Sequence, residues 1–94
     1  DISPDNIDAL VNKGSAFHLD KKYSDAISCY DKALKIDKKC PMALAYKGLS
    51  LAELGQLKEA IAYFKNALSI DKHYDLAQIS KDTAQDLLKS LQGK

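Results

Sequence analysis

The sequence contains no arginine and no tryptophan, and it has only two cysteines, two prolines and four glycines among its 94 residues. Without arginine, the chain lacks the planar guanidinium that recognises phosphate and carboxylate through paired hydrogen bonds. Its 14 lysines face 13 acidic residues, so the net charge is only +1. Nucleic-acid binding needs a concentrated positive field. We therefore expect no nucleic-acid partner.

The two cysteines, Cys29 and Cys40, do not have the spacing of a metal site and are too few for a disulfide framework. We expect two unpaired thiols in a reducing cytoplasm, with a single Cys29–Cys40 bridge as the alternative. The sequence does not open on a charged and then apolar leader, and no apolar run approaches the ~18 residues of a membrane span. These features predict a cytoplasmic localisation, no membrane partner and one domain over residues 1–94.

The sequence repeats itself with a period of about 34 residues, which is the separation of Gly14 and Gly48. The identical pairs at this separation are Ala9/Ala43, Leu10/Leu44, Lys13/Lys47, Gly14/Gly48, Ala26/Ala60, Ile27/Ile61, Ala33/Ala67, Leu34/Leu68, Ile36/Ile70, Asp37/Asp71 and Lys38/Lys72. Conservative pairs such as Tyr30/Phe64 share the same separation. Chance does not align so many identities at one shift, so the chain contains an internal repeat.

Each copy of the repeat predicts two helices. Apolar and small residues recur at the three-to-four spacing of one helix face, first around Gly14 and Gly48 and then around Tyr30 and Phe64. No stretch of useful length alternates with a period of two. Strands are therefore not expected.

Residues at the predicted helix ends support this interpretation. Gly55 suits the left-handed position that ends a helix, and Lys21 holds the equivalent place in the first copy at a cost of ~1 kcal/mol. Pro41 suits the first turn of a helix. Ser3 and Pro4 can open the first helix in the same way.

This pattern resembles the tetratricopeptide repeat. The matching residues are Leu10, Gly14, Phe17, Ala26, Tyr30 and Ala33 in the first copy, and Leu44, Gly48, Leu51, Ala60, Phe64 and Ala67 in the second. The resemblance implies an all-α fold, a right-handed α-solenoid of antiparallel helix hairpins, with repeat one at 7–40 and repeat two at 41–74. Small residues such as Gly14 let two helices approach, and Tyr30 and Phe64 then fill the wedge toward the next unit.

Residues 75–92 begin like a third copy, since Ala77 matches Ala43, but Asp82 stands where the earlier copies have glycine. We expect this segment to form a fifth helix that caps the stack, as terminal repeats do in solenoid proteins. The alternative is a third repeat interrupted after its first helix.

The sequence has no Gly-rich phosphate loop, no His-Glu pair at zinc spacing and no serine nucleophile elbow. We interpret His18 and His73 as solvated surface histidines, since neither has a second ligand near it in sequence. We therefore expect no cofactor, no metal and no enzymatic activity. An enzyme would need two or more titratable groups in one pocket, whereas the expected groove offers mainly His18 and Glu53.

The resemblance also implies a concave surface lined by the first helix of every unit. Outward-facing positions on these helices give the candidate partner-binding residues Val11, Asn12, Ser15, Met42, Ala45, Tyr46, Leu49, Leu76, Ile79 and Ser80. A wider set on the same face adds His18, Leu19, Glu53, Thr83 and Leu87. This surface is unusually apolar, and large apolar patches mark partner sites. The alternative is that some of these residues, above all Ala45 and Leu49, pack as core.

The expected function is a non-catalytic protein–protein interaction module, or scaffold, that binds an apolar peptide or helix in its concave groove. The alternative is an assembly platform that forms homo-oligomers through the same groove and the last helix. Some members of the family hold the C-terminal carboxylate of chaperones with Lys and Asn on this surface. The corresponding positions here are Val11, Ser15, Tyr46, Leu76 and Ser80. None of these is a cation, so no carboxylate clamp for a chaperone tail is expected.

Overall fold

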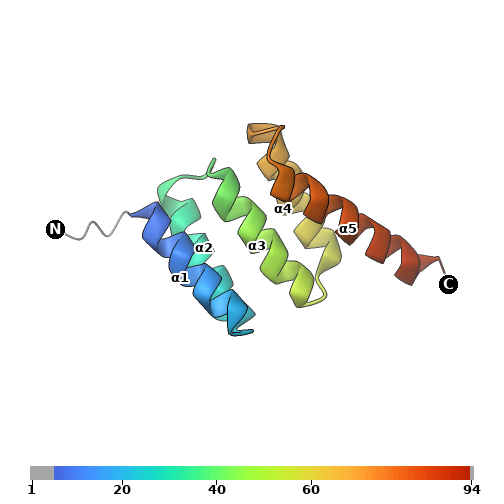
Figure 1. The fold of residues 1–94 in the computed structure, drawn as a ribbon, viewed down its shortest axis with the longest axis horizontal. Helices are drawn as coiled ribbons and strands as arrows, with labels where there is room; N and C mark the ends of the chain where they lie inside the picture. Colours follow the sequence, from blue (N-terminus) through green and yellow to red (C-terminus); the bar gives the residue numbers. More distant parts are fainter. Residues whose placement is uncertain (1–5, 94) are drawn as a thin grey trace.

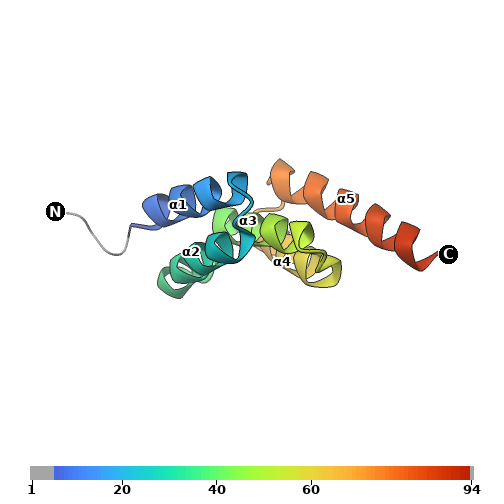
Figure 2. The same ribbon diagram turned by 90° about the horizontal axis from the view of Figure 1, so that it is seen from below.

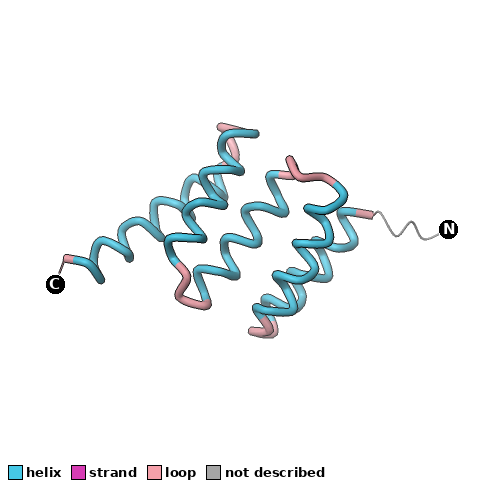
Figure 3. The backbone as a smooth tube through the Cα atoms, turned by 180° about the vertical axis from the view of Figure 1, so that it is seen from behind, coloured by secondary structure: helices cyan, strands magenta, loops and turns pink. Residues whose placement is uncertain are grey.

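The computed structural model describes residues 6–93, and over this range the chain forms five α-helices (Figure 1). They are α1 (Ile7–Leu19), α2 (Tyr23–Ile36), α3 (Pro41–Glu53), α4 (Leu57–Ile70) and α5 (Asp75–Gln92). Short loops join them, and no strand occurs in this part of the chain (Figure 3). The predicted all-α fold is confirmed.

Single residues explain where α1 and α3 begin. Asn6 precedes α1, and its side-chain oxygen accepts a hydrogen bond of 3.1 Å from the amide of Ala9, which satisfies one of the free N–H groups of the first turn. Pro41 occupies the first turn of α3, as predicted. Ser3 and Pro4, the other predicted helix start, lie outside the described residues.

The turn inside each hairpin contains one residue with a positive φ. This residue is Lys21 in the first turn, with φ of 62°, and Gly55 in the second, with φ of 85°. In both turns the next residue donates a backbone hydrogen bond, of 2.8 or 2.9 Å, to the carbonyl five positions earlier. The left-handed conformation predicted for both positions is confirmed, and only the lysine bears its steric cost.

A glycine and an aromatic ring lie at the centre of each hairpin. A Cβ atom placed on Gly48 would be 2.5 Å from the ring of Phe64, and one on Gly14 would clash with the ring of Tyr30 in the same way. Both rings are almost wholly buried, with 0% and 1% exposed. The absence of a side chain at the two glycines therefore lets an aromatic ring of the partner helix lie against the backbone. Each ring thus packs within its own unit, and Tyr30 in addition stacks on Tyr46 of the next unit at 6.0 Å between centroids.

Helix α3 is the centre of the stack, since it contacts α2 and α4 and also the flanking α1 and α5. The molecule is elongated, with extents of 54 × 28 × 18 Å. Figure 2 shows α1 and α5 on the opposite side of the stack from α2 and α4. We call the face bordered by α1, α3 and α5 the inner face.

A lysine side chain on α3 contacts residues of α2 and α4 at the boundary between the two units. Lys47 on α3 forms an ion pair with Asp31 on α2, at 2.5 Å, and its ammonium lies 4.5 Å from the ring centroid of Tyr63 on α4. Burial lowers the pKa of Lys47, but hydrogen bonds to Asp31 and Tyr63 outweigh it, so the pKa is raised overall. The charged ammonium is therefore the form that the folded protein favours.

Candidate functional site

The predicted partner-binding residues all lie on α1, α3 and α5, but they differ in exposure. Asn12 and Ile79 are exposed, and Ile79 presents 64% of its surface to solvent. The partly buried members are Ser15, Met42, Tyr46, Leu49, Leu76 and Ser80. Val11 and Ala45 are buried, with exposed fractions of 1% and 0%.

Val11 and Ala45 belong to the core, so the expectation that Val11 lines a surface is wrong. For Ala45 the alternative of a core position is confirmed, whereas Leu49 is only partly buried. Val11 packs in one cluster with Tyr30 and other residues of the first unit boundary, and Ala45 packs in another with Ala67 and Ala77. The reason is that α1 and α3 each pack against their own hairpin partner and also against a neighbouring unit. Neighbouring helices therefore cover more of the surface of α1 and α3 than a single apolar face along each helix predicts.

A first hollow of about 220 Å³ opens on the inner face between α1 and α3. We call it the α1/α3 hollow. It is lined by Ser15, His18, Leu19, Tyr30, Tyr46 and Leu49. Leu19 is 83% exposed, so an apolar rim borders a floor that includes hydroxyl and imidazole groups.

Hydrogen bonding fixes the floor of the α1/α3 hollow. His18 Nδ1 and the hydroxyl of Ser50 form a hydrogen bond of 2.8 Å, and Ser50 is completely buried. The His18 ring also meets that of Tyr23 edge-on, at 5.0 Å between centroids. The interpretation of His18 as a solvated surface histidine is therefore wrong, because the ring is partly buried and satisfies a core hydroxyl.

The phenol of Tyr30 faces the same polar groups. Burial raises the pKa of Tyr30, while hydrogen bonding with the hydroxyls of Ser15 and Ser50 acts in the opposite direction. The pKa is raised overall, so the neutral phenol is the favoured form. Tyr30 therefore offers this hollow a neutral hydroxyl group.

A second hollow of about 300 Å³ lies between α3 and α5. We call it the α3/α5 hollow. Its lining consists of Leu49, Ala52, Glu53, Leu57, Phe64, Ile79, Ser80, Thr83, Ala84 and Leu87. Leu49 lines both hollows and separates them. The two hollows therefore adjoin each other at Leu49 along the inner face.

Some of the predicted partner-binding residues line these hollows, and others lie outside them. Ser15, Tyr46, Leu49, Ile79 and Ser80 line one or both hollows, as do all five members of the wider set. Asn12, Met42 and Leu76 line neither. Sequence reasoning missed the contribution of the core residues Tyr30, Leu57, Phe64 and Ala84 and of the partly buried Ala52. A helical pattern shows which residues are apolar but not where two helices diverge enough to expose them.

Other kinds of site find little support in the described part of the chain. Over residues 6–93, no three His, Cys, Asp or Glu side chains come together in a way that would hold a metal ion. Within the same range, no helix has the length and apolar character needed to cross a bilayer. Both Cys29 and Cys40 are unpaired thiols, as the first of the two interpretations predicted.

Comparison with known proteins places the repeat in a family. Models described as tetratricopeptide repeat match residues 7–40 and 41–78. Human tetratricopeptide repeat protein 13 is 35% identical over an alignment of 72 positions, which covers 71% of this chain and 8% of that protein. The chain spans only 7–12% of the length of the curated relatives it matches.

Solved structures share the fold. The tetratricopeptide domain of Sgt2 from Aspergillus fumigatus has a TM-score of 0.87 at 27% identity, and the match covers 97% of this chain and 60% of that one. The second such domain of Spaghetti (RPAP3), bound to the HSP90 peptide SRMEEVD, has a TM-score of 0.84 at 23% identity, with 92% and 80% covered. The solenoid architecture implied by the repeat is confirmed.

Proposed function

The chain belongs to the tetratricopeptide repeat family, and from this premise we propose that it is a non-catalytic protein-interaction module that binds an apolar peptide segment on its inner face. Domains of this fold typically serve as interaction modules, and one neighbour of this chain is described with a bound peptide. The observation that carries the proposal is the pair of hollows on either side of Leu49.

The size of the hollows favours side chains of a peptide over a small-molecule ligand. Their volumes of about 220 and 300 Å³ lie at or below the lower end of the ~300–1,000 Å³ typical of ligand pockets. Two such hollows in a row suit two side chains of one segment. Ile79, at 64% exposed, and Leu87, at 50% exposed, border the second hollow and supply apolar area that a partner would cover.

The two hollows differ in polarity, and this difference predicts what each accepts. The floor of the α1/α3 hollow includes Tyr30 and His18, so it suits an apolar side chain with a polar tip. The floor of the α3/α5 hollow includes Phe64 and Ala84, so it suits an aliphatic or aromatic side chain. A partner segment is therefore expected to carry a purely apolar residue at one of its two anchor positions.

We do not expect the partner to be held by its terminal carboxylate. The positions at which related domains place Lys and Asn are occupied here by Val11, Ser15, Tyr46, Leu76 and Ser80, and Val11 is in addition buried. The peptide SRMEEVD, with which one structural neighbour is described, is the appropriate probe. Isothermal titration of that peptide should show no saturable binding at concentrations where related clamps saturate. Saturable binding that disappears when its terminal carboxylate is amidated would contradict this part of the proposal.

Selection from a library of short random peptides tests the function directly. We expect sequences with two apolar anchors to be enriched on the immobilised protein. Their affinity should fall about tenfold with Ile79→Ser, as expected for an interface hot spot. Leu91→Ser is the matched control, because Leu91 is also 64% exposed on α5 but does not line either hollow. Selected peptides that respond to Leu91→Ser and not to Ile79→Ser would refute the assignment of the inner face.

A second candidate function is self-association through the same groove and α5. Three of the exposed large apolar side chains, Ile79, Leu87 and Leu91, lie on this one helix, and contiguous apolar exposure favours association. Sedimentation velocity over a range of concentrations distinguishes the two functions. A monomer at high concentration would remove self-association, whereas a dimer that dissociates with Ile79→Ser would support it over peptide binding.

We also propose that the protein resides in the cytoplasm. Two unpaired thiols, one of them the buried Cys29, fit a reducing cytoplasm. Thiol labelling of the protein purified from its natural source would test this, since two reactive or unfolding-exposed thiols are expected. A Cys29–Cys40 disulfide would contradict it.

A further inference from the structure

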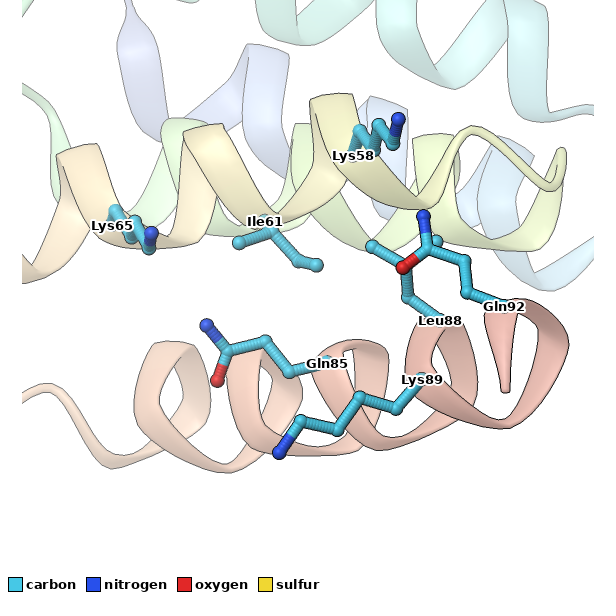
Figure 4. A pocket seen from close by; sticks show the side chains of 7 residues that line it. All are labelled: Lys58, Ile61, Lys65, Gln85, Leu88, Lys89 and Gln92. Carbon is cyan, nitrogen blue, oxygen red and sulfur yellow. The ribbon is translucent and has the colours of Figure 1, made fainter.

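A groove on another part of the molecule has a composition unlike that of the inner face. It lies between α4 and α5, has a volume of about 460 Å³, and is lined by Lys58, Ile61, Lys65, Gln85, Leu88, Lys89 and Gln92. Figure 4 shows Ile61 and Leu88 on facing helices, with the lysines and glutamines around them. The lining thus combines three ammonium groups with an apolar floor and includes no carboxylate. We call it the α4/α5 groove.

The apolar floor continues toward the C-terminal end of α5. A neighbouring hollow of about 300 Å³ shares Lys58 and Leu88 with the groove and adds Leu91, which is 64% exposed. Glu59 is the one acidic residue in the lining of this extension. The apolar residues Leu88 and Leu91 are three positions apart on α5, which is the spacing of a helix face.

The repeat allows a comparison with the corresponding residue of the first unit. Ile61 is the equivalent of Ile27 in the first copy. Ile27 packs against a cluster to which α4 contributes Leu57 and Phe64. In the first unit the equivalent isoleucine therefore packs on the apolar cluster of the second unit, and it also lines an open hollow of about 370 Å³.

The charges differ between the two boundaries. At the first boundary, Asp31 pairs with Lys47. The equivalent residues one repeat later are Lys65 and Lys81, so the acid of the first boundary is replaced by a second base. Like charges at this place repel one another, and an acidic ligand would relieve the repulsion.

A third hairpin of the same geometry does not fit here. Gly14 and Gly48 each admit an aromatic ring against the backbone, but the equivalent position on α5 is Asp82. The carboxylate of Asp82 accepts hydrogen bonds of 3.0 and 3.2 Å from Gln78 Nε2. A helix on this side must therefore pack further along α5, over Leu88, which is where the groove lies.

We propose that the α4/α5 groove binds an acidic amphipathic helix of a partner protein, with its apolar face on Ile61 and Leu88 and its carboxylates on Lys58, Lys65 and Lys89. The apolar floor between two helices suits the apolar face of a third helix, and the three lysines of the lining make an acidic helix the complementary one. A phosphate polymer fits less well, because the apolar floor would stay uncovered and the chain's net charge of +1 gives little long-range attraction. This site is separate from the inner face and does not rest on the function proposed for it.

A designed peptide is the probe. It is built from Ala, Glu and Leu, long enough for about five helical turns, with the leucines on one face of the helix and glutamates beside them. One control peptide has the same composition with the leucines distributed around the helix, and another has lysine in place of glutamate. Fluorescence anisotropy should show saturable binding of the first peptide only. Equal binding of the peptide with distributed leucines would overturn the proposal, since it would mean attraction by charge alone.

Variants locate the site on the full chain. Lys65→Glu combined with Lys89→Glu should weaken binding of the acidic peptide about tenfold or more, which corresponds to ~1.4 kcal/mol. The control, Lys13→Glu combined with Lys38→Glu, changes the net charge equally at two exposed positions outside the groove. It should leave the affinity within about twofold. Equal losses in both double variants would refute the site.

Amide chemical shifts separate this groove from the inner face. With the acidic peptide bound, the largest changes are expected for α4 and the second half of α5. Changes centred on Leu49 and Ile79 instead would overturn the proposal without touching that for the inner face. Tighter binding to anionic phosphatidylserine vesicles than to the peptide, lost in the same Lys65→Glu and Lys89→Glu variant, would identify a membrane surface and would also overturn it.

Discussion

The two repeat units build the same hairpin around centres of different polarity. In the first unit Tyr30 lies against Gly14, and the hydroxyls of Ser15 and Ser50 act on its phenol. The equivalent residues one repeat later are Phe64, Leu49 and Ala84, which pack together in an apolar cluster. A hydroxyl group is present at all three positions around the first centre and at none of them around the second. A buried polar group at the centre therefore occurs together with polar groups that can bond to it.

The shape of the centre is kept although its chemistry changes. The glycine and the ring make the same close approach in both units, so that a Cβ atom on either glycine would overlap the ring. The fold therefore depends on the pairing of a small residue with a flat ring, while polarity is free to vary. This difference also gives the two hollows of the inner face their different floors.

Removing either ring should have the largest effect on stability. Phe64→Ala and Tyr30→Ala are each expected to lower the free energy of unfolding by about 3–5 kcal/mol, because a fully buried ring leaves a cavity. Urea unfolding followed by circular dichroism measures the loss. A small domain has little stability to spare, so either variant is expected to be partly unfolded at room temperature. A loss below about 1 kcal/mol in one unit only would show that the two centres are not equivalent.

Adding a methyl group at the glycines should have the next largest effect. Gly14→Ala and Gly48→Ala are each expected to lower the free energy of unfolding by about 1–3 kcal/mol through overpacking, although alanine is the better helix former. Asp82→Ala at the equivalent position of α5 is the control. It should change stability by less than about 0.5 kcal/mol, since that aspartate is exposed. Stabilisation by Gly48→Ala would contradict the close packing of Phe64.

Adding a hydroxyl group to the ring of the second unit, or removing it from the ring of the first, tests the difference in polarity. Phe64→Tyr should lower the free energy of unfolding by about 1–3 kcal/mol, because the new hydroxyl lies among apolar side chains. Tyr30→Phe should cost only about 0.5–1.5 kcal/mol, the value of a typical hydrogen bond. The same denaturation experiment compares them, and equal costs would mean that Ser15 and Ser50 do not matter to Tyr30.

The ion pair at the first boundary should contribute less, and its contribution should depend on pH. Lys47→Met is expected to lower the free energy of unfolding by about 1 kcal/mol at pH 8, since the pair is partly exposed. Because the pKa of Lys47 is raised in the folded state, the stabilisation is fully present below the unfolded value of about 10.4. It is lost as the pH rises through the folded value. A difference between wild type and variant that persists unchanged at pH 11.5 would contradict this assignment.

The smallest effect is expected in the turns. Lys21→Gly should raise the free energy of unfolding by about 0.5–1 kcal/mol, because glycine adopts the positive φ of this position without a steric cost. Gly55→Lys should lower it by a similar amount. Thermal unfolding of the two variants gives shifts of opposite sign. Shifts of the same sign would show that the two turns are not equivalent.

Much of the fold was predictable because its determinants are local. The period of the repeat, the helical spacing of small and apolar residues, and the residues at Lys21, Gly55 and Pro41 can be read from neighbours in sequence and from comparison of the two copies. The structure has its helices, turns and left-handed residues at these places. The resemblance also pointed to the face on which Ser15, Tyr46, Leu49, Ile79 and Ser80 border hollows.

The burial of individual side chains and their hydrogen-bond partners were less predictable from the sequence. Val11 and Ala45 are apolar residues on the predicted face, yet both are buried. His18 forms its hydrogen bond with Ser50, which lies on another helix in the next repeat unit. The angle at which one hairpin stacks on the next decides these contacts, and no local pattern encodes that angle.

The amino-acid sequence alone thus specified two helical hairpins, their turns and a fifth helix, because hydrogen bonding within a helix and the conformational limits of glycine and proline act over a few residues. The packing of the hairpins decided the remaining features: a core that includes Val11 and Ala45, two hollows divided by Leu49, and a lysine-lined groove between α4 and α5. These depend on how surfaces distant in sequence fit together, since the free energy of burial is gained only where those surfaces meet.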